Sequence, residues 1–506
     1  MRERFQTTRK LLRDTFLQVD VRTLGFARIA IGLLLLFDLA KRSTELAIWY
    51  TDQGVLPNAL LAARPFRTYG YSLLFYVDSL VWVRVVFVLF AFVYLCFLFG
   101  VFTRVVHVLS WLCLVSLHVR TDMVANGGDF VFSHLVLWTA FLPLGAAFSI
   151  DARRREKAGK PPIASPHVSW AFLVVLLQLA TIYYFNGVQK TGDTWKDGTA
   201  VYWLAHQERL VTWFGYHMRE NLPLLVFQGL TYVSLALEYA LPWLILSPWG
   251  RPWTRRLAIL AGLSLHLGIA AVANVGLFSF VMITFLTLLI STEDWEWLRT
   301  KFRAWRGEKA PVVEALTLLP PDRMPAPSRS PWRWVSGLAL AFLFLVATSQ
   351  VLVENGAVPR VLRVTQPAWV KASMMTFRLY QGWAMFAKDA PRGDSWVVVD
   401  AVTEDGRHVD PLNEVASRYA DPSLRELPPR LGQNYYWCDY VMRIGESRAY
   451  RSGLGDWIYR YHERTGDDDD RIVAFRAYRV THNPPSPGET EPTDVAVKRI
   501  MRRSRR

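Results

Sequence analysis

The sequence has 506 residues and a formal net charge of +15, and 52% of its residues are hydrophobic against 20% that are charged. Soluble globular proteins usually carry about 25% charged residues, and here the charges gather between long apolar stretches. This composition excludes an ordinary soluble protein and favours an integral membrane protein. Because the positive residues border the apolar stretches, we expect membrane lipid as a partner and no nucleic acid.

Nine apolar stretches are long enough, or nearly so, to cross the hydrocarbon core of a bilayer. A spanning helix needs about 20 predominantly apolar residues. The sequence therefore predicts a mainly α-helical polytopic membrane protein with about nine transmembrane helices. The predicted spans are residues 23–40, 82–100, 105–119, 130–149, 168–188, 223–247, 257–274, 276–291 and 333–353.

The segment before the first span combines apolar and basic residues. Within residues 1–22, Phe5, Leu12, Phe16 and Val19 alternate with five arginines and lysines. This pattern is typical of an amphipathic helix that lies on the cytoplasmic membrane surface. A basic N-terminus without regular structure is the alternative.

Loop charges predict the orientation in the membrane. Positive residues of short loops accumulate on the cytoplasmic side. The N-terminus, the loop at 151–160 and the loop at 251–256 are all basic, whereas the loops on the opposite side are more balanced. A cytoplasmic N-terminus and an odd number of spans would place everything after residue 353 outside the cytoplasm.

The chain changes character towards its C-terminal end. We expect a cytoplasmic linker over 301–332, a last transmembrane helix over 333–353 and a small β-rich extracytoplasmic domain over 355–482. In that domain, alternating apolar residues predict strands at 395–402, 435–444 and 471–481. Residues 483–506 are rich in proline and then in arginine, which predicts a disordered basic tail drawn to anionic lipid.

Motifs for metals and nucleotides are missing from the sequence. Its three cysteines have no zinc or iron–sulfur spacing, and no Walker motif or Gly-x-Gly-x-x-Gly sequence follows a predicted strand. We therefore expect no metal and no nucleotide cofactor.

Ionisable residues inside predicted spans are costly in hydrocarbon and mark structural pairs or functional sites. His134, Glu238 and His266 lie within spans, and Lys190 ends the fifth span on the predicted outer side. Taken singly, such residues are more often interhelical hydrogen-bond partners than catalysts. His134, His266 and Lys190 are expected to converge with Asp38 of the first span, and with Asn126 and Asp129 of the outer loop before the fourth span, on a cavity that opens outward. The list of candidates is His134, His266 and Lys190 as catalytic residues and Asn126, Asp129, Trp195 and Glu238 as ligand-binding residues.

Lys190 stands in the segment Tyr183–Gly198, which closes a span with aromatic residues and then forms a Gly/Asp turn carrying Trp195. One interpretation is a lysine that extends to the interface beside an aromatic belt residue. The other is a desolvated amine that acts as a base, because burial disfavours the charged form.

Several motifs in this region resemble one membrane family. The sequences Gly187-Val188-Gln189-Lys190 and Asp193-Thr194-Trp195 resemble the vitamin K-dependent γ-glutamyl carboxylases and their bacterial relatives, the HTTM (horizontally transferred transmembrane) domain proteins. The resemblance extends over about residues 10–300, and 381–386 and 457–461 resemble the outer domain of bacterial HTTM proteins. The other matching pieces are Arg28–Asp38, Leu237-Glu238-Tyr239, and His266 with Gly276–Met282.

The resemblance implies a role for Lys190 as the base that deprotonates reduced vitamin K, with His266 as a second site residue. In the carboxylases, oxygen then converts the quinol to a strong base that removes a γ-proton from glutamate, and carbon dioxide traps the carbanion. One segment departs from the family pattern: Asn126-Gly127-Gly128-Asp129 replaces an Asn-Asn-His-Ser-Tyr-like sequence. The histidine of that sequence is missing unless His134 replaces it.

Two functions follow from this resemblance. The first, which we favour, is an enzyme of the bacterial cytoplasmic (inner) membrane that uses Lys190 as a base on a reduced quinone or another lipid-soluble cofactor. A peptide or protein substrate would then reach it from the extracytoplasmic side. The alternative is a non-catalytic membrane component for peptide or toxin maturation or export. A Lys190 amine buried beside an apolar slot favours the first function, and one in bulk water favours the second.

Overall fold

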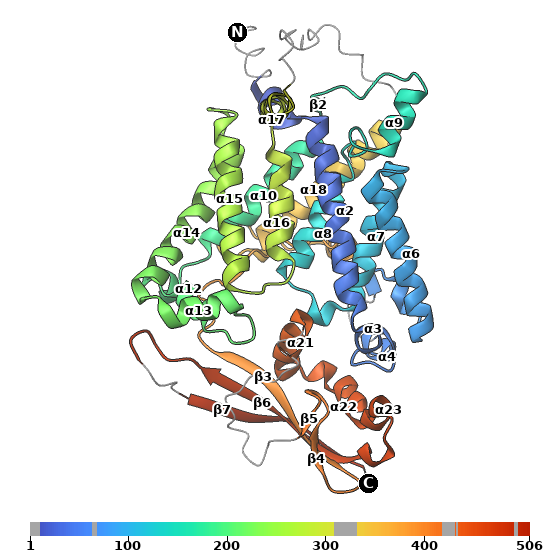
Figure 1. Cartoon of the computed structure of the whole chain (residues 1–506), viewed down its shortest axis with the longest axis vertical. Coiled ribbons are helices and arrows are strands. Elements are labelled where there is room, and N and C mark those ends of the chain that lie inside the picture. Colours follow the sequence, from blue (N-terminus) through green and yellow to red (C-terminus); the bar gives the residue numbers. More distant parts are fainter. Residues whose placement is uncertain are drawn as a thin grey trace.

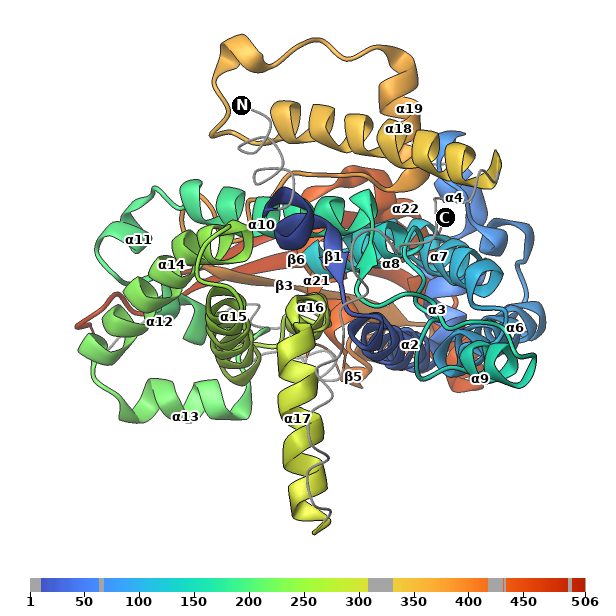
Figure 2. The same cartoon turned by 90° about the horizontal axis from the view of Figure 1, so that it is seen from above.

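The structure is a computed structural model that describes residues 11–62, 68–307, 331–416, 431, 434–489 and 494–505. A layer of roughly aligned helices makes up most of the molecule, and a domain containing a β-sheet lies against one end of this layer (Figure 1). Seen from above, helices α18 and α19 flank one side of the layer and α17 extends away from the opposite side (Figure 2). The predicted surface helix falls partly on residues 1–10 and the predicted linker mostly on 308–330, which lie outside the described residues.

Six helices in the described part of the chain are long and apolar enough to span a membrane, or seven if one bent pair counts as a span. They are α2 (Val21–Ser43), α6 (Leu80–Phe99), α10 (Trp170–Val188), α14 (Leu224–Leu246), α15 (Trp253–Val272) and α18 (Pro331–Glu354). Each corresponds to a span predicted from the sequence. The chain is therefore a helical membrane protein by length and composition.

The prediction of nine spans is not confirmed, because three of the predicted spans fall short. Helix α7 (Thr103–Arg120) is continuous, but two arginines and two histidines lower its hydrophobicity. Helix α8 (Gly127–Thr139) has 13 residues and covers only about 20 Å at 1.5 Å per residue. Helix α16 (Phe278–Leu286) continues as a 3₁₀ turn and then bends by 91° into α17 (Thr292–Trp305). Helix α17 also carries regular structure into the predicted linker.

The remaining elements are short. The helices are α3 (Leu46–Tyr50), α4 (Asn58–Ala62), α9 (Ile150–Lys157), α11 (Asp193–Lys196), α12 (Ala200–Ala205), α13 (Trp213–Asn221), α19 (Ala368–Phe377), α21 (Tyr435–Glu446), α22 (Arg451–Tyr459) and α23 (Tyr461–Thr465). Single-turn helices cover Arg13–Leu17, Leu73–Tyr76, Asp122–Val124, Thr287–Leu289, Arg360–Leu362, Arg448–Tyr450 and Asp468–Asp470. Strands β1 (Gln18–Val19) and β2 (His167–Val168) pair beside the start of α10.

The C-terminal domain contains an antiparallel sheet of five strands in the order β5-β4-β3-β6-β7. The predicted strands at 395–402 and 471–481 are confirmed, because the first lies within β3 and the second coincides with β6 from Ile472 onward. Val399 of β3 faces Ala477 of β6, and Ala477 faces Met501 of β7. The strands are β3 (Asp394–Thr403), β4 (His408–Asp410), β5 (Val415–Ala416), β6 (Ile472–Asn483) and β7 (Asp494–Ser504).

Two predictions for this domain were wrong. The segment 435–444 is not a strand but most of helix α21. Residues 436–441 are buried without interruption, so the alternation of a half-buried strand is absent, and the Asn434 side chain accepts a hydrogen bond from the Tyr436 N–H and caps the helix. The tail 483–506 is not wholly irregular, because β7 pairs with β6 along its length. The apolar side chains of Val495, Ile500 and Met501 pack against the core, which favours the strand despite its basic residues.

The basic loop segment and the C-terminal domain lie at opposite ends of the helical layer (Figure 1). Helices α9 and α17 lie at one end, and the five-stranded sheet lies at the other. This relative placement agrees with the loop charges, which predict a cytoplasmic α9 and an extracytoplasmic sheet.

Topology reporters test this orientation directly. Alkaline phosphatase, which is active only outside the cytoplasm, is expected to be active when fused to the C-terminal end of the full chain. The same enzyme fused after Lys157, at the end of α9, is expected to be inactive. Green fluorescent protein fused at the two positions should give the reverse pattern, and equal phosphatase activity from both fusions would contradict the orientation.

The stability of the C-terminal domain is expected to depend on pH through Asp439 of α21. This side chain is buried, its Oδ2 has no hydrogen-bond partner among the described residues, and burial raises its pKa to about 6. A carboxyl group whose pKa is raised by folding contributes stability that is fully present below its pKa in the unfolded chain. That contribution is lost as the pH rises through the folded-state pKa of about 6. The loss is about 1.4 kcal/mol per pKa unit.

Melting curves at pH 4.5 and pH 7.5 measure this effect. The Asp439→Asn variant should lose less stability than the wild type between the two values. Asp469→Asn, in an exposed turn, is the matched control and should follow the wild type. An unchanged pH dependence in Asp439→Asn would show that this carboxyl group does not titrate in this range.

Candidate active site

Lys190 is buried in an ion pair directly after the C-terminal end of α10. Its side chain is 4% exposed, and its Nζ lies 2.6 Å and 2.5 Å from the two carboxylate oxygens of Glu238 on α14. The same ammonium group lies 4.4 Å from the centre of the Trp195 ring, within the range of a cation–π interaction. The amine is therefore held between a carboxylate and an aromatic face and does not extend into bulk water.

The Glu238 carboxylate has a further fixed neighbour. The Asn186 side-chain amide donates to Glu238 Oε1 at 2.9 Å, and its oxygen accepts from the Met385 N–H at 2.9 Å. The two helices approach closely here, because a Cβ on Gly187 would lie 3.5 Å from the Cβ of Glu238. Asn186 thus connects the ion pair to the segment that precedes the C-terminal sheet.

A second polar pair lies on the same face of α10. Residues 183, 186 and 190 are three or four positions apart, a spacing that aligns side chains along one side of a helix. The Tyr183 hydroxyl lies 2.8 Å from His266 Nε2 on α15. The other ring nitrogen, Nδ1, is buried and has no hydrogen-bond partner among the described residues. His266 therefore retains one unused polar atom.

These residues line one cavity of about 280 Å³ in the helical layer. Five of the seven predicted site residues belong to its wall: Asn126, Lys190, Trp195, Glu238 and His266. Most of the other lining residues are apolar, among them Leu265, Phe278 and Met282. The cavity thus combines an apolar interior with one buried ion pair and one Tyr–His pair.

Asp129 is not among the residues that line this cavity. Its carboxylate accepts from the Arg42 guanidinium at 2.9 Å and lies 3.2 Å from His118 Nε2. It also accepts from the Asn126 N–H in a capping box at the start of α8. The capping box turns Asp129 back towards the helix start, so that Asn126, Gly127 and Gly128 of this segment line the cavity and Asp129 does not.

His134 does not line the cavity either. Its Nδ1 lies 2.6 Å from the Phe130 carbonyl oxygen, and its Nε2 lies 3.1 Å from the Gln381 side-chain amide nitrogen. The Gln381 amide also bonds to Gln178 and to the Trp383 indole. His134 is therefore part of a polar network between α8, α10 and residues 381–383.

Gly127 and Gly128 belong to the segment that departs from the Asn-Asn-His-Ser-Tyr-like sequence named above for the γ-glutamyl carboxylases. A Cβ on Gly127 would lie 2.8 Å from Met385 Sδ, and one on Gly128 would lie 2.9 Å from the backbone of Phe278. Those two neighbours fill the space that a histidine side chain would need. His134 does not substitute for that histidine in this structure.

A segment of the C-terminal part closes the site over the loop that carries Lys190. The Gln189 side chain donates to the Trp383 carbonyl oxygen at 2.7 Å, and the Trp195 indole donates to the Phe386 carbonyl oxygen at 2.9 Å. The Thr194 N–H and hydroxyl both donate to Asp389. Gly192 is needed for this contact, because a Cβ there would lie 2.1 Å from the Asp389 carboxylate.

Sequence reasoning missed several lining residues. Tyr183 and Asn186 share the spacing of Lys190 along α10, so helical periodicity would have found them. Met385, Phe386 and Tyr435 also line the cavity, but they are separated from Lys190 by about 200 residues or more of chain. No local pattern in the sequence points to them.

Comparisons with known proteins identify one family. The family model described as HTTM domain matches residues 16–295, which is more than half of the chain and includes the helices α2 to α16. Comparisons with curated proteins and with solved structures found no match.

Proposed function

The chain belongs to the HTTM domain family, and we propose that it is a membrane enzyme that transfers a proton at the Lys190–Glu238 pair. The proposed ligand is a lipid-soluble compound with an acidic hydroxyl group, of which a reduced quinone fits best. The observation that carries the proposal is the buried ion pair in the wall of a mostly apolar cavity. An ionisable pair at membrane depth is costly and marks a functional site.

The residues present fit such a ligand. Phe278, Met282 and Trp195 offer apolar surface to a ring, and the ion pair offers charge to one ring oxygen. The unpartnered Nδ1 of His266 offers a hydrogen bond to a second polar atom. When bound, a reduced quinone would supply an acidic ring hydroxyl and two electrons.

The pair can both accept a proton and stabilise the anion that remains. A carboxylate or a neutral amine takes a proton within hydrogen-bond reach. The positive charge shared by the pair then lies beside the new anion, in a site of low dielectric where such an interaction is strong. Asn186 holds Glu238 in place through this change, and Trp195 shields the amine from water.

The resemblance to the γ-glutamyl carboxylases supports a base at Lys190 but not the whole carboxylase reaction. The space of the family histidine is filled by Met385 and Phe278. Glutamate carboxylation is therefore not part of this proposal. A peptide substrate on the extracytoplasmic side stays a prediction from the resemblance.

Ligand binding tests the proposal independently of turnover. Mass spectrometry of the purified chain is expected to detect a co-purified quinone, and a short-chain reduced quinone should raise the melting temperature. Ser234 lines the cavity and Ser264 faces outward from α15. Ser234→Phe should therefore abolish the rise, and the control Ser264→Phe should retain it. A rise that survives in Ser234→Phe, or the absence of any quinone binding, would favour the non-catalytic alternative.

A further inference from the structure

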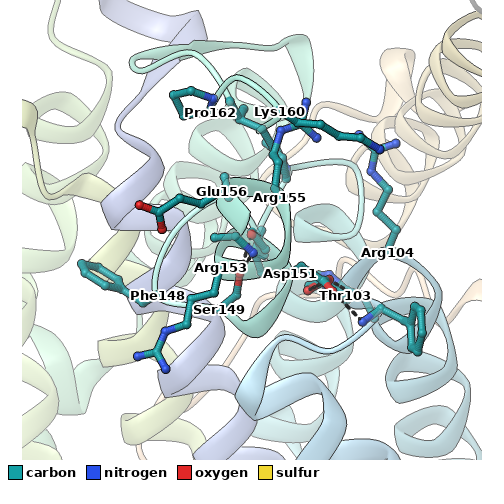
Figure 3. Close-up of a pocket in the computed structure, with 18 of the residues that line it drawn as sticks. Thr103, Arg104, Phe148, Ser149, Asp151, Arg153, Arg155, Glu156, Lys160 and Pro162 are labelled. Atoms are coloured by element: carbon teal, nitrogen blue, oxygen red, sulfur yellow. Dashed lines mark hydrogen bonds between the residues drawn. The ribbon is translucent and has the colours of Figure 1, made fainter. Parts of the chain in front are cut away.

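A second cavity, of about 1050 Å³, lies at the end of the helical layer that carries α9 (Figure 3). Its wall comes from the start of α7, from residues 140–149 after α8, and from α9 with the chain that follows it to Ile163. None of its lining residues belongs to the Lys190 cavity. It is therefore a separate site at the opposite end of the layer from the sheet.

The carboxylate of Asp151, which lines this cavity, already has partners within the protein. Asp151 accepts hydrogen bonds from the N–H groups of Phe102 and Thr103 and from the Thr103 hydroxyl, at 2.7 to 3.0 Å. The buried Arg28 guanidinium donates to three carbonyl oxygens within residues 144–148. The floor therefore offers no free anion to the cations around it.

Four cations line the cavity and are exposed. Figure 3 shows Arg104 reaching from α7 towards the segment that carries Arg155 and Lys160. None of the four forms an ion pair with another residue in the described part of the chain, and Glu156 is the one lining acid besides Asp151. The four are Arg104, Arg153, Arg155 and Lys160. The Arg155 Nε donates to the Pro161 carbonyl oxygen at 2.6 Å, but the rim has an excess of positive charge without an ion-pair partner among the described residues.

Apolar side chains accompany these cations. Phe102, Val105 and Phe148 line the cavity and are 67%, 64% and 55% exposed. In a membrane protein, such residues near the end of the helical layer face lipid. The cavity therefore presents positive charge beside an apolar surface, which is the complement of a phospholipid head group and the first part of its acyl chains.

We infer that this cavity binds an anionic phospholipid from the leaflet at the α9 end of the layer. The phosphate group lies among Arg104, Arg155 and Lys160, and the acyl chains lie over Val105 and Phe148. Soluble phosphate compounds share the head-group chemistry but not the apolar part. The apolar rim is the observation that favours the lipid.

Lipid titrations of the purified full chain test this site. The melting temperature is measured in a neutral detergent with added phosphatidylglycerol, phosphatidylcholine or sodium phosphate. We expect phosphatidylglycerol to bind roughly tenfold or more tightly than phosphatidylcholine, because each cation near anionic lipid contributes favourably. In the triple variant Arg104→Gln, Arg155→Gln and Lys160→Gln, this preference is lost.

A matched control distinguishes specific binding in the cavity from non-specific attraction of anionic lipid to positive charge. The triple variant Arg299→Gln, Lys301→Gln and Arg306→Gln removes the same charge from the exposed surface of α17, at the same end of the layer. It should keep the preference for phosphatidylglycerol. Loss of the preference in this control, or its survival in the cavity variant, would overturn the site. Equal stabilisation by sodium phosphate alone would overturn the lipid as its ligand.

A photoreactive phosphatidylglycerol provides a measurement on the wild type that needs no variant. Labelled peptides should map to residues 102–107 and 140–149, which line the cavity. Labelling spread evenly over the apolar surfaces of α6 and α14 would contradict a specific site.

Discussion

Lys190→Arg is expected to fold and to insert into the membrane but to lose about 10²- to 10⁴-fold in activity, the usual cost of removing a general base. Arginine keeps the positive charge and can still pair with Glu238. It cannot release a proton near neutral pH, because its pKa stays above about 12. Oxidation of a reduced quinone by dissolved oxygen, which requires the deprotonated hydroxyl, measures the loss in lipid nanodiscs, and melting curves verify the fold.

The control for this variant is Lys196→Arg. Lys196 lies in the same loop, but its side chain is 69% exposed and it forms only a long pair with Asp193. Its activity should equal that of the wild type. Lys190→Ala should also be inactive, with partial rescue by small primary amines that enter the vacated space. Full activity in Lys190→Arg would show that Lys190 serves only as a structural cation.

Glu238→Ala is expected to cost about 3–5 kcal/mol of stability, because it leaves the Lys190 ammonium buried without its partner. The carboxylate is 5% exposed and receives hydrogen bonds from both Lys190 and Asn186. Replacing both members of the pair, by Lys190→Met with Glu238→Leu, should recover most of that stability, since an apolar pair of similar volume has no uncompensated charge. Melting temperatures of the purified variants measure both effects.

An exposed ion pair provides the comparison. Glu220 pairs with Arg219 and its side chain is 51% exposed, so Glu220→Ala should cost at most about 1 kcal/mol. If Glu238→Ala were as mild as Glu220→Ala, water would have to reach Lys190, and the site would not be a buried one. If the double variant is stable but inactive, the pair serves the reaction and not the fold.

The sequence alone predicted the features that depend on local composition. Six long apolar stretches became helices of spanning length because about 20 apolar residues form a helix in hydrocarbon whatever their neighbours are. The strands β3 and β6 were predicted for a similar reason, because successive side chains of a strand point to opposite faces and give the sequence a period of two. The sequence also predicted a shared cavity for Lys190, His266 and Asn126, which all line it.

Other features depended on contacts that no local pattern contains. Segment 435–444 has the aromatic residues of a strand, but it forms a helix in which residues 436–441 are all buried by packing against distant parts of the chain. Strand β7 exists because the free edge of β6 offers hydrogen bonds to a tail that alone has little reason to fold. Helices α8 and α16 are too short to span, because α8 ends at Thr139 and α16 ends at Leu286, before the bend into α17.

The assembly of the site shows the same division. Helical spacing along α10 places Tyr183, Asn186 and Lys190 on one face, and this can be counted in the sequence. The pairing of Lys190 with Glu238 and the closure by Met385 join residues 48 and 195 positions apart. The contacts of Asp129 with Arg42 and His118, and the network that holds His134, also depend on the tertiary structure. Sequence pattern determines which side chains share a helix face, whereas packing between distant segments decides which of those faces meet around a cavity.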